Sequence, residues 1–456
     1  MSRTDQQIET KHNREGLPSK TKNKLALLLL TTSGLFSWAI RGQAGYGAIP
    51  GCIFAGTLWG LTWYFLSAEE TAVKKRRYGL GWVVAAFVFG IGISGMQGWG
   101  DIVSMVRGEL LYQLDPREFL EVSKWWGLFY LALAGFHWAG TGTVFLAWCG
   151  SKTPATLKTW AFRILSVALG VLVFWLLLYL LPHIFLPNYE LLDSYNYALY
   201  PKLPDLYAEI FQALLFTGAV LGALTYEILQ KDWLNVKIIL IPALVTGITW
   251  MGLIVLWELI VPPWAYANDI HFNWWRCWES TGGAAIGFGF GLAFIVCNQE
   301  LTPDDPLQRE QSYSAHPNAA LLIGLYLAAL AGLAHATIQS IKGALHIDYP
   351  HIPELDQTQA GWAIPVACLF LLLWGFLVYN QQKNPFEIKT DGTPPIPFIQ
   401  FFIFGYLLLR IMGLNVTRGQ TFDPVEFTFF LYYVVLAILD LYCVRYWWKA
   451  KMPAKS

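Results

Sequence analysis

Charged side chains are scarce in this sequence, and their scarcity excludes most soluble folds. Asp, Glu, Lys and Arg make up 14% of the 456 residues, whereas soluble domains carry about a quarter. Hydrophobic residues reach 55% and the mean hydropathy is +0.42, so much of the surface must contact lipid. The formal net charge is zero, which argues against a nucleic-acid partner because such partners attract basic patches.

Motifs for metal binding and soluble catalysis are also missing. The six cysteines lie in or beside apolar runs without a CxxC pair, so they predict neither a disulfide framework nor a zinc site. The chain has no phosphate-binding loop, no HExxH zinc motif and no nucleophile elbow. We therefore predict no metal, no cofactor and no catalytic residue.

A cleavable signal peptide is not evident either. Residues 1–24 are polar and basic, and the apolar run after them has no small-residue cleavage site before Arg41. We interpret this run as a first membrane helix that stays in the chain.

Long apolar runs dominate what is present, and most match the roughly 20 residues that cross a bilayer. The 22 tryptophans fit such spans, because indole rings favour the membrane interface. The sequence therefore predicts an all-α polytopic integral membrane protein with about 12 transmembrane helices. The runs fall near 25–40, 48–67, 78–98, 125–148, 159–181, 207–229, 236–258, 275–297, 319–341, 361–380, 397–414 and 425–447.

Basic residues occupy alternate connections between these runs and so predict the orientation. By the positive-inside rule, both termini lie in the cytoplasm, and we expect a protein of the bacterial inner (plasma) membrane. The basic connections are the N-terminal tail, 74–77, 152–158, 231–237, 383–389 and the C-terminal tail. The predicted organisation is a cytoplasmic basic tail at 1–24, a first membrane bundle at 25–297, a cytoplasmic loop at 298–318, a second membrane bundle at 319–448 and a cytoplasmic tail at 449–456.

A weak internal repeat emerges when the chain is shifted by 149 positions. Residues 108–111 (GELL) then fall on 257–260 (WELI), which aligns Glu109 with Glu258. Repeated helical hairpins are a known construction of transporters, whereas chance similarity among tryptophan-rich segments is the alternative explanation. The hairpins would span 78–149 and 236–298.

The stretch SWAIRGQAGYGAIPG, residues 37–51, interrupts two apolar runs with an arginine and several glycines. Irregular backbone at membrane depth is tolerated where it lines a cavity, and an arginine there suits an anionic group. We predict that Arg41 and Gln43 bind solute on an unwound segment. The alternative is a tight outer turn from which Arg41 reaches the headgroups. The Arg-Gly-Gln tripeptide recurs at Arg418 and Gln420, again after an apolar run.

Other polar residues lie at the outer starts of helices or within them. Arg276 and Glu279 are three residues apart and can share a helix face. Asp101 and Glu109 belong to a segment that we expect to form an amphipathic outer helix. For these charges, ion pairing at the interface is the alternative to a solute-binding vestibule.

His137 lies near the middle of its predicted span, where ionisable residues are costly and face a cavity or a partner. A neutral histidine that is hydrogen-bonded in the bundle core is the alternative. Gly283, Gly287 and Gly291, by contrast, are four residues apart and predict a face for close helix packing.

We interpret the protein as a secondary transporter of a small polar or anionic solute. Its expected partners are a small-molecule solute or a lipid, together with the surrounding membrane lipids. The number of spans, the interrupted glycine-rich segment and the weak repeat favour this interpretation. A membrane-embedded transferase, acting on a lipid-linked substrate at the outer face with His137 or Asp101 as base, is the alternative. A noncatalytic scaffold is a third hypothesis. The predicted solute-binding residues are Arg41, Gln43, His137, Arg276, Glu279, Arg418 and Gln420.

Overall fold

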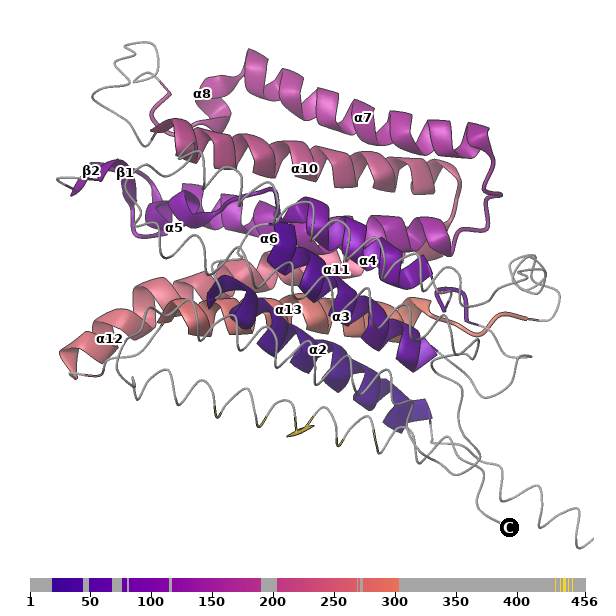
Figure 1. The fold of residues 1–456 in the computed structure, drawn as a ribbon. Helices are drawn as coiled ribbons and strands as arrows, with labels where there is room; N and C mark the ends of the chain where they lie inside the picture. The colour runs from indigo at the N-terminus through magenta and orange to yellow at the C-terminus, as the bar shows by residue number, and fades with distance from the viewer. Residues whose placement is uncertain are drawn as a thin grey trace, which may run out of the picture.

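The computed structural model describes most of the chain between residues 19 and 302, in which helices predominate (Figure 1). The described residues are 19–43, 49–67, 76–79, 82–114, 117–189, 203–268, 270, 274–302 and isolated positions between 431 and 445. The helices are α2 (Ser19–Gln43), α3 (Ile49–Ser67), α4 (Trp82–Ser94), α5 (Gly100–Val106), α6 (Lys124–Cys149), α7 (Leu157–Leu180), α8 (Pro182–Phe185), α10 (Leu203–Leu229), α11 (Trp233–Ile254), the π-helix η1 (Val255–Ile260), α12 (Val261–Ala267) and α13 (Trp274–Cys297). The strands β1 (Glu109–Leu114) and β2 (Arg117–Glu121) form an antiparallel hairpin.

Each apolar run predicted between residues 25 and 297 contains a helix or a continuous series of helices, although the run 78–98 is helical only over the 13 residues of α4. The helical class is therefore confirmed in this part of the chain. Among the described residues, four helices are long and apolar enough to cross a membrane, which supports an integral membrane protein. They are Leu157–Leu180, Asp205–Leu229, Trp233–Ala267 and Arg276–Cys297. The predicted spans 319–341, 361–380 and 397–414, and most of 425–447, lie outside the described residues.

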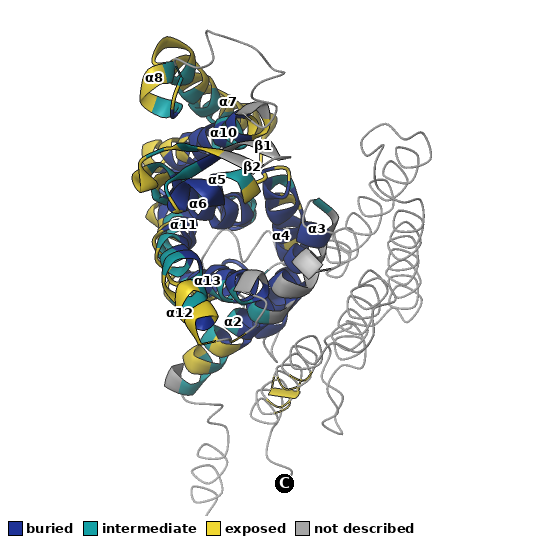
Figure 2. Ribbon diagram, turned by 90° about the vertical axis from the view of Figure 1, so that its left-hand side faces the viewer, coloured by how far each residue is buried: buried dark blue, intermediate teal, exposed yellow. Residues whose placement is uncertain are grey.

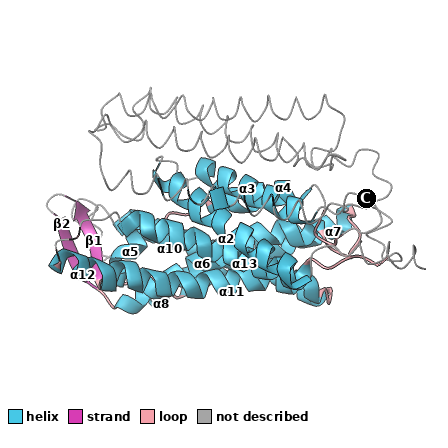
Figure 3. Cartoon of the chain, turned by 90° about the horizontal axis from the view of Figure 1, so that it is seen from below, coloured by secondary structure: helices cyan, strands magenta, loops and turns pink. Residues whose placement is uncertain are grey.

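Six helices form a closed ring in the order α2, α3, α4, α6, α11 and α13 (Figure 2). Outside the ring, α10 packs against α6, and α7 packs against α10. The apolar α7 is exposed over most of its surface, as expected for a helix that faces lipid. The hairpin lies at one end of the helices, here called the hairpin end (Figure 3). Asp232 and the connections 150–156 and 298–302 lie at the opposite end, here called the Asp232 end.

Aromatic side chains fill the centre of the ring. The centroid of the Trp38 ring lies 5.0 Å from that of the Trp138 ring and 6.3 Å from that of the Trp250 ring. Trp250 in turn lies 5.4 Å from Trp278 in an edge-to-face arrangement, a favourable geometry for aromatic pairs. We call Trp38, Trp59, Trp99, Trp138, Trp250 and Trp278 the tryptophan cluster; all six are buried.

Glycines allow α2 and α13 to pack closely and antiparallel, as the glycine spacing in α13 predicts. A Cβ atom on Gly283 would lie 2.3 Å from the Gly34 carbonyl oxygen, and one on Gly287 would lie 2.1 Å from the Leu30 carbonyl oxygen. Only a residue without a Cβ permits this approach. Continuing the same register toward the hairpin end brings the backbone of residue 41 level with that of residue 276.

Replacing Gly283 by leucine is expected to lower the free energy of unfolding by about 3 kcal/mol or more, because the two helices must separate. Gly252→Ala is the matched control, since a Cβ there meets nothing within 4 Å. The control should be neutral or slightly stabilising. Thermal unfolding of the purified variants measures both effects; equal stability of Gly283→Leu and the wild type would contradict the close packing.

The prediction of one amphipathic helix from Asp101 to Glu109 is wrong beyond Val106. Gly108 has a φ of +88°, a left-handed value that favours glycine and ends α5. Glu109 then begins β1 instead of continuing the helix. Because Glu258 lies in the π-helix η1, the aligned segments 108–111 and 257–260 differ in backbone conformation. The remainder of the repeat stays a prediction.

Candidate functional site

The best-defined polar site within the ring joins Gln97 to His137. Helix α4 ends at Ser94 and is followed by a tight turn, in which the backbone N–H of Gln97 donates to the Ser94 carbonyl oxygen. This turn brings Gln97 against the middle of α6, where His137 is fully buried. Ser94 itself forms a 2.8 Å hydrogen bond with the hydroxyl of Thr141, one helical turn after His137.

One oxygen of Gln97 serves two neighbouring side chains of α6. The Gln97 Oε1 atom contacts His137 Nε2 and accepts a 3.0 Å hydrogen bond from Trp138 Nε1. A carboxamide oxygen can only accept, so we assign the histidine proton to Nε2. His137 Nδ1 is then an acceptor in a neutral ring, which stacks on Phe216 at 5.2 Å.

This pair has hydrogen-bonding capacity that no described residue fills. His137 Nδ1, an acceptor, and Gln97 Nε2, a donor, are buried without a partner among the described residues. Each such atom costs about 1–3 kcal/mol when it is removed from water. Other ring helices carry further buried polar atoms without described partners: Ser37 Oγ in α2, Thr246 Oγ1 in α11 and Trp278 Nε1 in α13.

The remaining predicted site residues fall into three groups. Arg276 and Glu279 are buried in the first two turns of α13, on either side of Trp278 of the tryptophan cluster. Arg41 and Gln43 form the last turn of α2, whose register brings residue 41 level with residue 276. The side chains of Arg41 and Gln43 are outside the described part of the structure. Residues 44–48, Arg418 and Gln420 lie outside it as well.

The prediction that Arg41 sits on an unwound segment is wrong for its backbone. Helix α2 continues through Arg41 and ends at Gln43. A single glycine within a helix costs only about 1 kcal/mol, so Gly42 does not end it. Helix α3 then begins at Ile49, and residues 44–48 lie outside the described residues.

Acidic residues at the hairpin end are engaged in structural contacts. Arg107 Nη1 lies 2.8 Å from Glu258 Oε2, and Arg107 Nε lies 3.3 Å from Glu109 Oε2. Glu109 and Glu258 thus form ion pairs with Arg107, as the alternative expects, while their location at a membrane interface stays a prediction. Glu209 of α10 accepts hydrogen bonds from the backbone amides of Asp101 and Ile102 at the start of α5.

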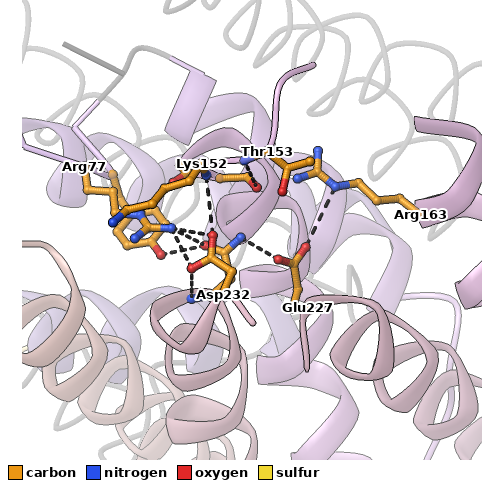
Figure 4. A network of polar contacts seen from close by, with 10 residues as sticks. Arg77, Lys152, Thr153, Arg163, Glu227 and Asp232 are labelled. Carbon is orange, nitrogen blue, oxygen red and sulfur yellow. Dashed lines mark hydrogen bonds and ion pairs between the residues drawn. The ribbon is translucent and has the colours of Figure 1, made fainter. Parts of the chain in front are cut away.

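The sequence did not single out a second polar cluster, which lies at the Asp232 end (Figure 4). Arg77, only 2% exposed, donates through Nη2 to both carboxylate oxygens of Asp232, at 2.7 and 2.6 Å. The Asp232 side chain also caps α11 by accepting a hydrogen bond from the backbone N–H of Asn235. The Asn235 side chain accepts from the Tyr78 hydroxyl and donates to Glu227 Oε2 at 2.8 Å.

The cluster ends in a loosely joined ion pair. Arg163 Nε in α7 lies 3.8 Å from Glu227 Oε1 in α10, beyond hydrogen-bond distance. Their side chains are only 1% and 0% exposed. Both residues lie inside apolar runs, and this position was the feature of the sequence that could have pointed to them, because an ionisable residue there needs a partner. The sequence does not say which partner.

Comparisons with protein-family models, with curated proteins and with solved structures find no match.

Proposed function

We propose that this chain is a secondary transporter of a small polar or anionic solute, built from about 12 transmembrane helices with both termini in the cytoplasm. Related helical hairpins are part of the proposal. The Asp232 end, where Arg77 and Lys152 lie, would face the cytoplasm under the positive-inside rule.

One observation supports this function above others: the unfilled hydrogen-bonding capacity of Gln97 and His137. A packed aromatic core would normally exclude such atoms, because a buried polar group without a partner is destabilising. A polar solute that accepts from Gln97 Nε2 and donates to His137 Nδ1 would offset that cost. Solute sites of secondary transporters lie between helices near the bilayer midplane, which is where the middle of a spanning α6 would place His137.

The transferase hypothesis needs acidic or basic groups that are available beside a phosphate-binding arginine. At the hairpin end, Glu109 and Glu258 already pair with Arg107, and Glu209 binds the backbone of α5. These contacts engage the carboxylates of Glu109, Glu258 and Glu209 in the fold. The bases named for a transferase, His137 and Asp101, are not among them, so the two hypotheses are separated by the fate of the solute in the transport assay.

Variants of Arg41 test whether the predicted binding residues act on the solute. Lysine keeps the charge but loses the planar fork that grips a carboxylate or phosphate, so Arg41→Lys should reduce uptake about 10- to 100-fold. Arg41→Ala should abolish uptake. The measurement is uptake of radiolabelled solute into proteoliposomes, after a thermal-shift screen of small polar compounds has identified a stabilising one.

Lys24→Ala, an exposed change at the opposite end of α2, is the matched control and should leave uptake unchanged. Uptake is compared at equal amounts of reconstituted protein, and only between variants whose unfolding temperature equals that of the wild type. Wild-type uptake by both Arg41 variants would make Arg41 an interface anchor and remove it from the site.

A further inference from the structure

The Arg163–Glu227 pair differs from its neighbour in how fully its atoms are used. Arg77 and Asp232 form short hydrogen bonds, whereas Arg163 Nε, Arg163 Nη2 and Glu227 Oε1 have no hydrogen-bond partner among the described residues. Arg163 nevertheless stays charged at any accessible pH. A guanidinium buried with unfilled donors is destabilising unless a guest accepts from it.

Aromatic rings hold the guanidinium in place without using its N–H groups. The centre of the Arg163 guanidinium lies 5.7 Å from the Trp148 ring, 5.4 Å from Trp160 and 5.7 Å from Tyr226. Such contacts attract the cation through its face and leave its edge available. Nε and Nη2 form one edge, with parallel donors that match two oxygens of a planar anion.

The charges around the pair limit what can bind. Besides Arg163 from α7, the groups near Glu227 are Asp232 and Asn235 at the start of α11, Arg77 and Tyr78 before α4, and Tyr226 in α10 itself. Cys149 at the end of α6 lies near Arg163, and the backbone amide of Lys152 donates to Asp232. Arg77 and Asp232 neutralise each other through their own hydrogen bonds. An anion added beside an ionised Glu227 would leave a net negative charge in a buried site, which is strongly unfavourable.

We infer that the Nε–Nη2 edge of Arg163 binds a small planar oxyanion, such as nitrate or a carboxylate, and that Glu227 takes up one proton as the anion binds. In the empty site, Glu227 balances the charge of Arg163. In the occupied site, the anion balances it, and a proton from solution forms an O–H bond at Glu227 Oε1. The net charge of the site is unchanged, and Glu227 Oε2 still accepts from Asn235. This inference concerns binding alone and does not depend on the proposed transport function.

Calorimetry of the purified full chain in lipid nanodiscs tests the inference, with nitrate as the probe at constant ionic strength. Titrations in buffers of different ionisation enthalpy count the protons taken up. We expect one proton per nitrate, and a Kd that rises about tenfold for each pH unit once Glu227 ionises in the empty site. Absence of nitrate binding, or binding without proton uptake, would overturn it.

Glu227→Gln should bind nitrate without proton uptake and with a Kd that is independent of pH, because glutamine keeps the acceptor for Asn235 but not the titrating group. Glu300→Gln is the matched control: Arg76 and Glu300 lie at the same 3.8 Å separation, but the Glu300 side chain is exposed (47% accessible) and that of Arg76 is only partly buried (19%). This control should retain the wild-type proton count. A pH-dependent Kd in Glu227→Gln would contradict the assignment of the proton.

The double variant Arg163→Met/Glu227→Met separates binding from folding. Replacing a buried ion pair by apolar residues of similar size is often neutral or stabilising, and loss of the acceptor for Asn235 costs only about 1–3 kcal/mol, so the chain should fold. It should nevertheless lose nitrate binding. Nitrate binding at wild-type affinity by the double variant would place the anion elsewhere and refute the site.

Discussion

His137→Met is expected to reduce solute uptake by about a hundredfold or more, because a site built to hydrogen-bond a solute discriminates strongly against loss of the group. The free energy of unfolding should be unchanged or slightly higher. Methionine fills the buried volume, and the substitution removes the unsatisfied Nδ1 acceptor. Gln97 Oε1 keeps its donor in Trp138. A residue that served only the core would not show these opposite effects.

Thr143→Val on the same helix is the control for His137→Met. The Thr143 hydroxyl is buried and donates to the carbonyl oxygens of Ala139 and Gly140 within α6. The change should leave uptake unchanged and lower stability by about 1 kcal/mol. Full uptake by His137→Met, measured beside chemical unfolding, would assign His137 to core packing.

Asp232→Ala is expected to produce the largest loss of stability, about 3–5 kcal/mol, because it leaves the Arg77 charge buried without its carboxylate. The loss of the cap on α11 adds about 1 kcal/mol. Denaturant unfolding of the purified protein measures the change. Glu300→Ala removes an exposed carboxylate at the same end and should cost no more than about 1 kcal/mol. Equal effects of the two substitutions would show that burial of the Arg77–Asp232 pair contributes little.

The helices could be predicted from the sequence because a bilayer demands long apolar segments, which composition alone reveals. Glycine spacing likewise predicted the close face of α13, since a missing Cβ is a property of the sequence itself. The order of helices around the ring could not be predicted in this way. The contact between α6 and α11, for example, joins apolar surfaces that many other pairings would bury equally well.

The candidate site was only partly predictable for the same reason. His137 was conspicuous because an ionisable residue in an apolar run is rare, whereas Gln97 is an uncharged amide at the end of the predicted run 78–98 and carries no such signal. Arg163 and Glu227 did carry it, yet their pairing depends on α7 and α10 lying side by side. At Arg41, glycine content suggested unwinding, but the helix tolerates Gly42 and continues to Gln43.

Counterflow into proteoliposomes tests the central claim, solute transport, most directly. Vesicles containing the full chain are loaded with an excess of the unlabelled solute found in the thermal-shift screen and diluted into a trace of labelled solute. We expect the label to accumulate transiently inside the vesicles and to be recovered chemically unchanged. With His137→Met, accumulation should be about a hundredfold slower. Label that fails to accumulate, or that is recovered covalently attached to lipid, would contradict transport; attachment to lipid would favour the transferase.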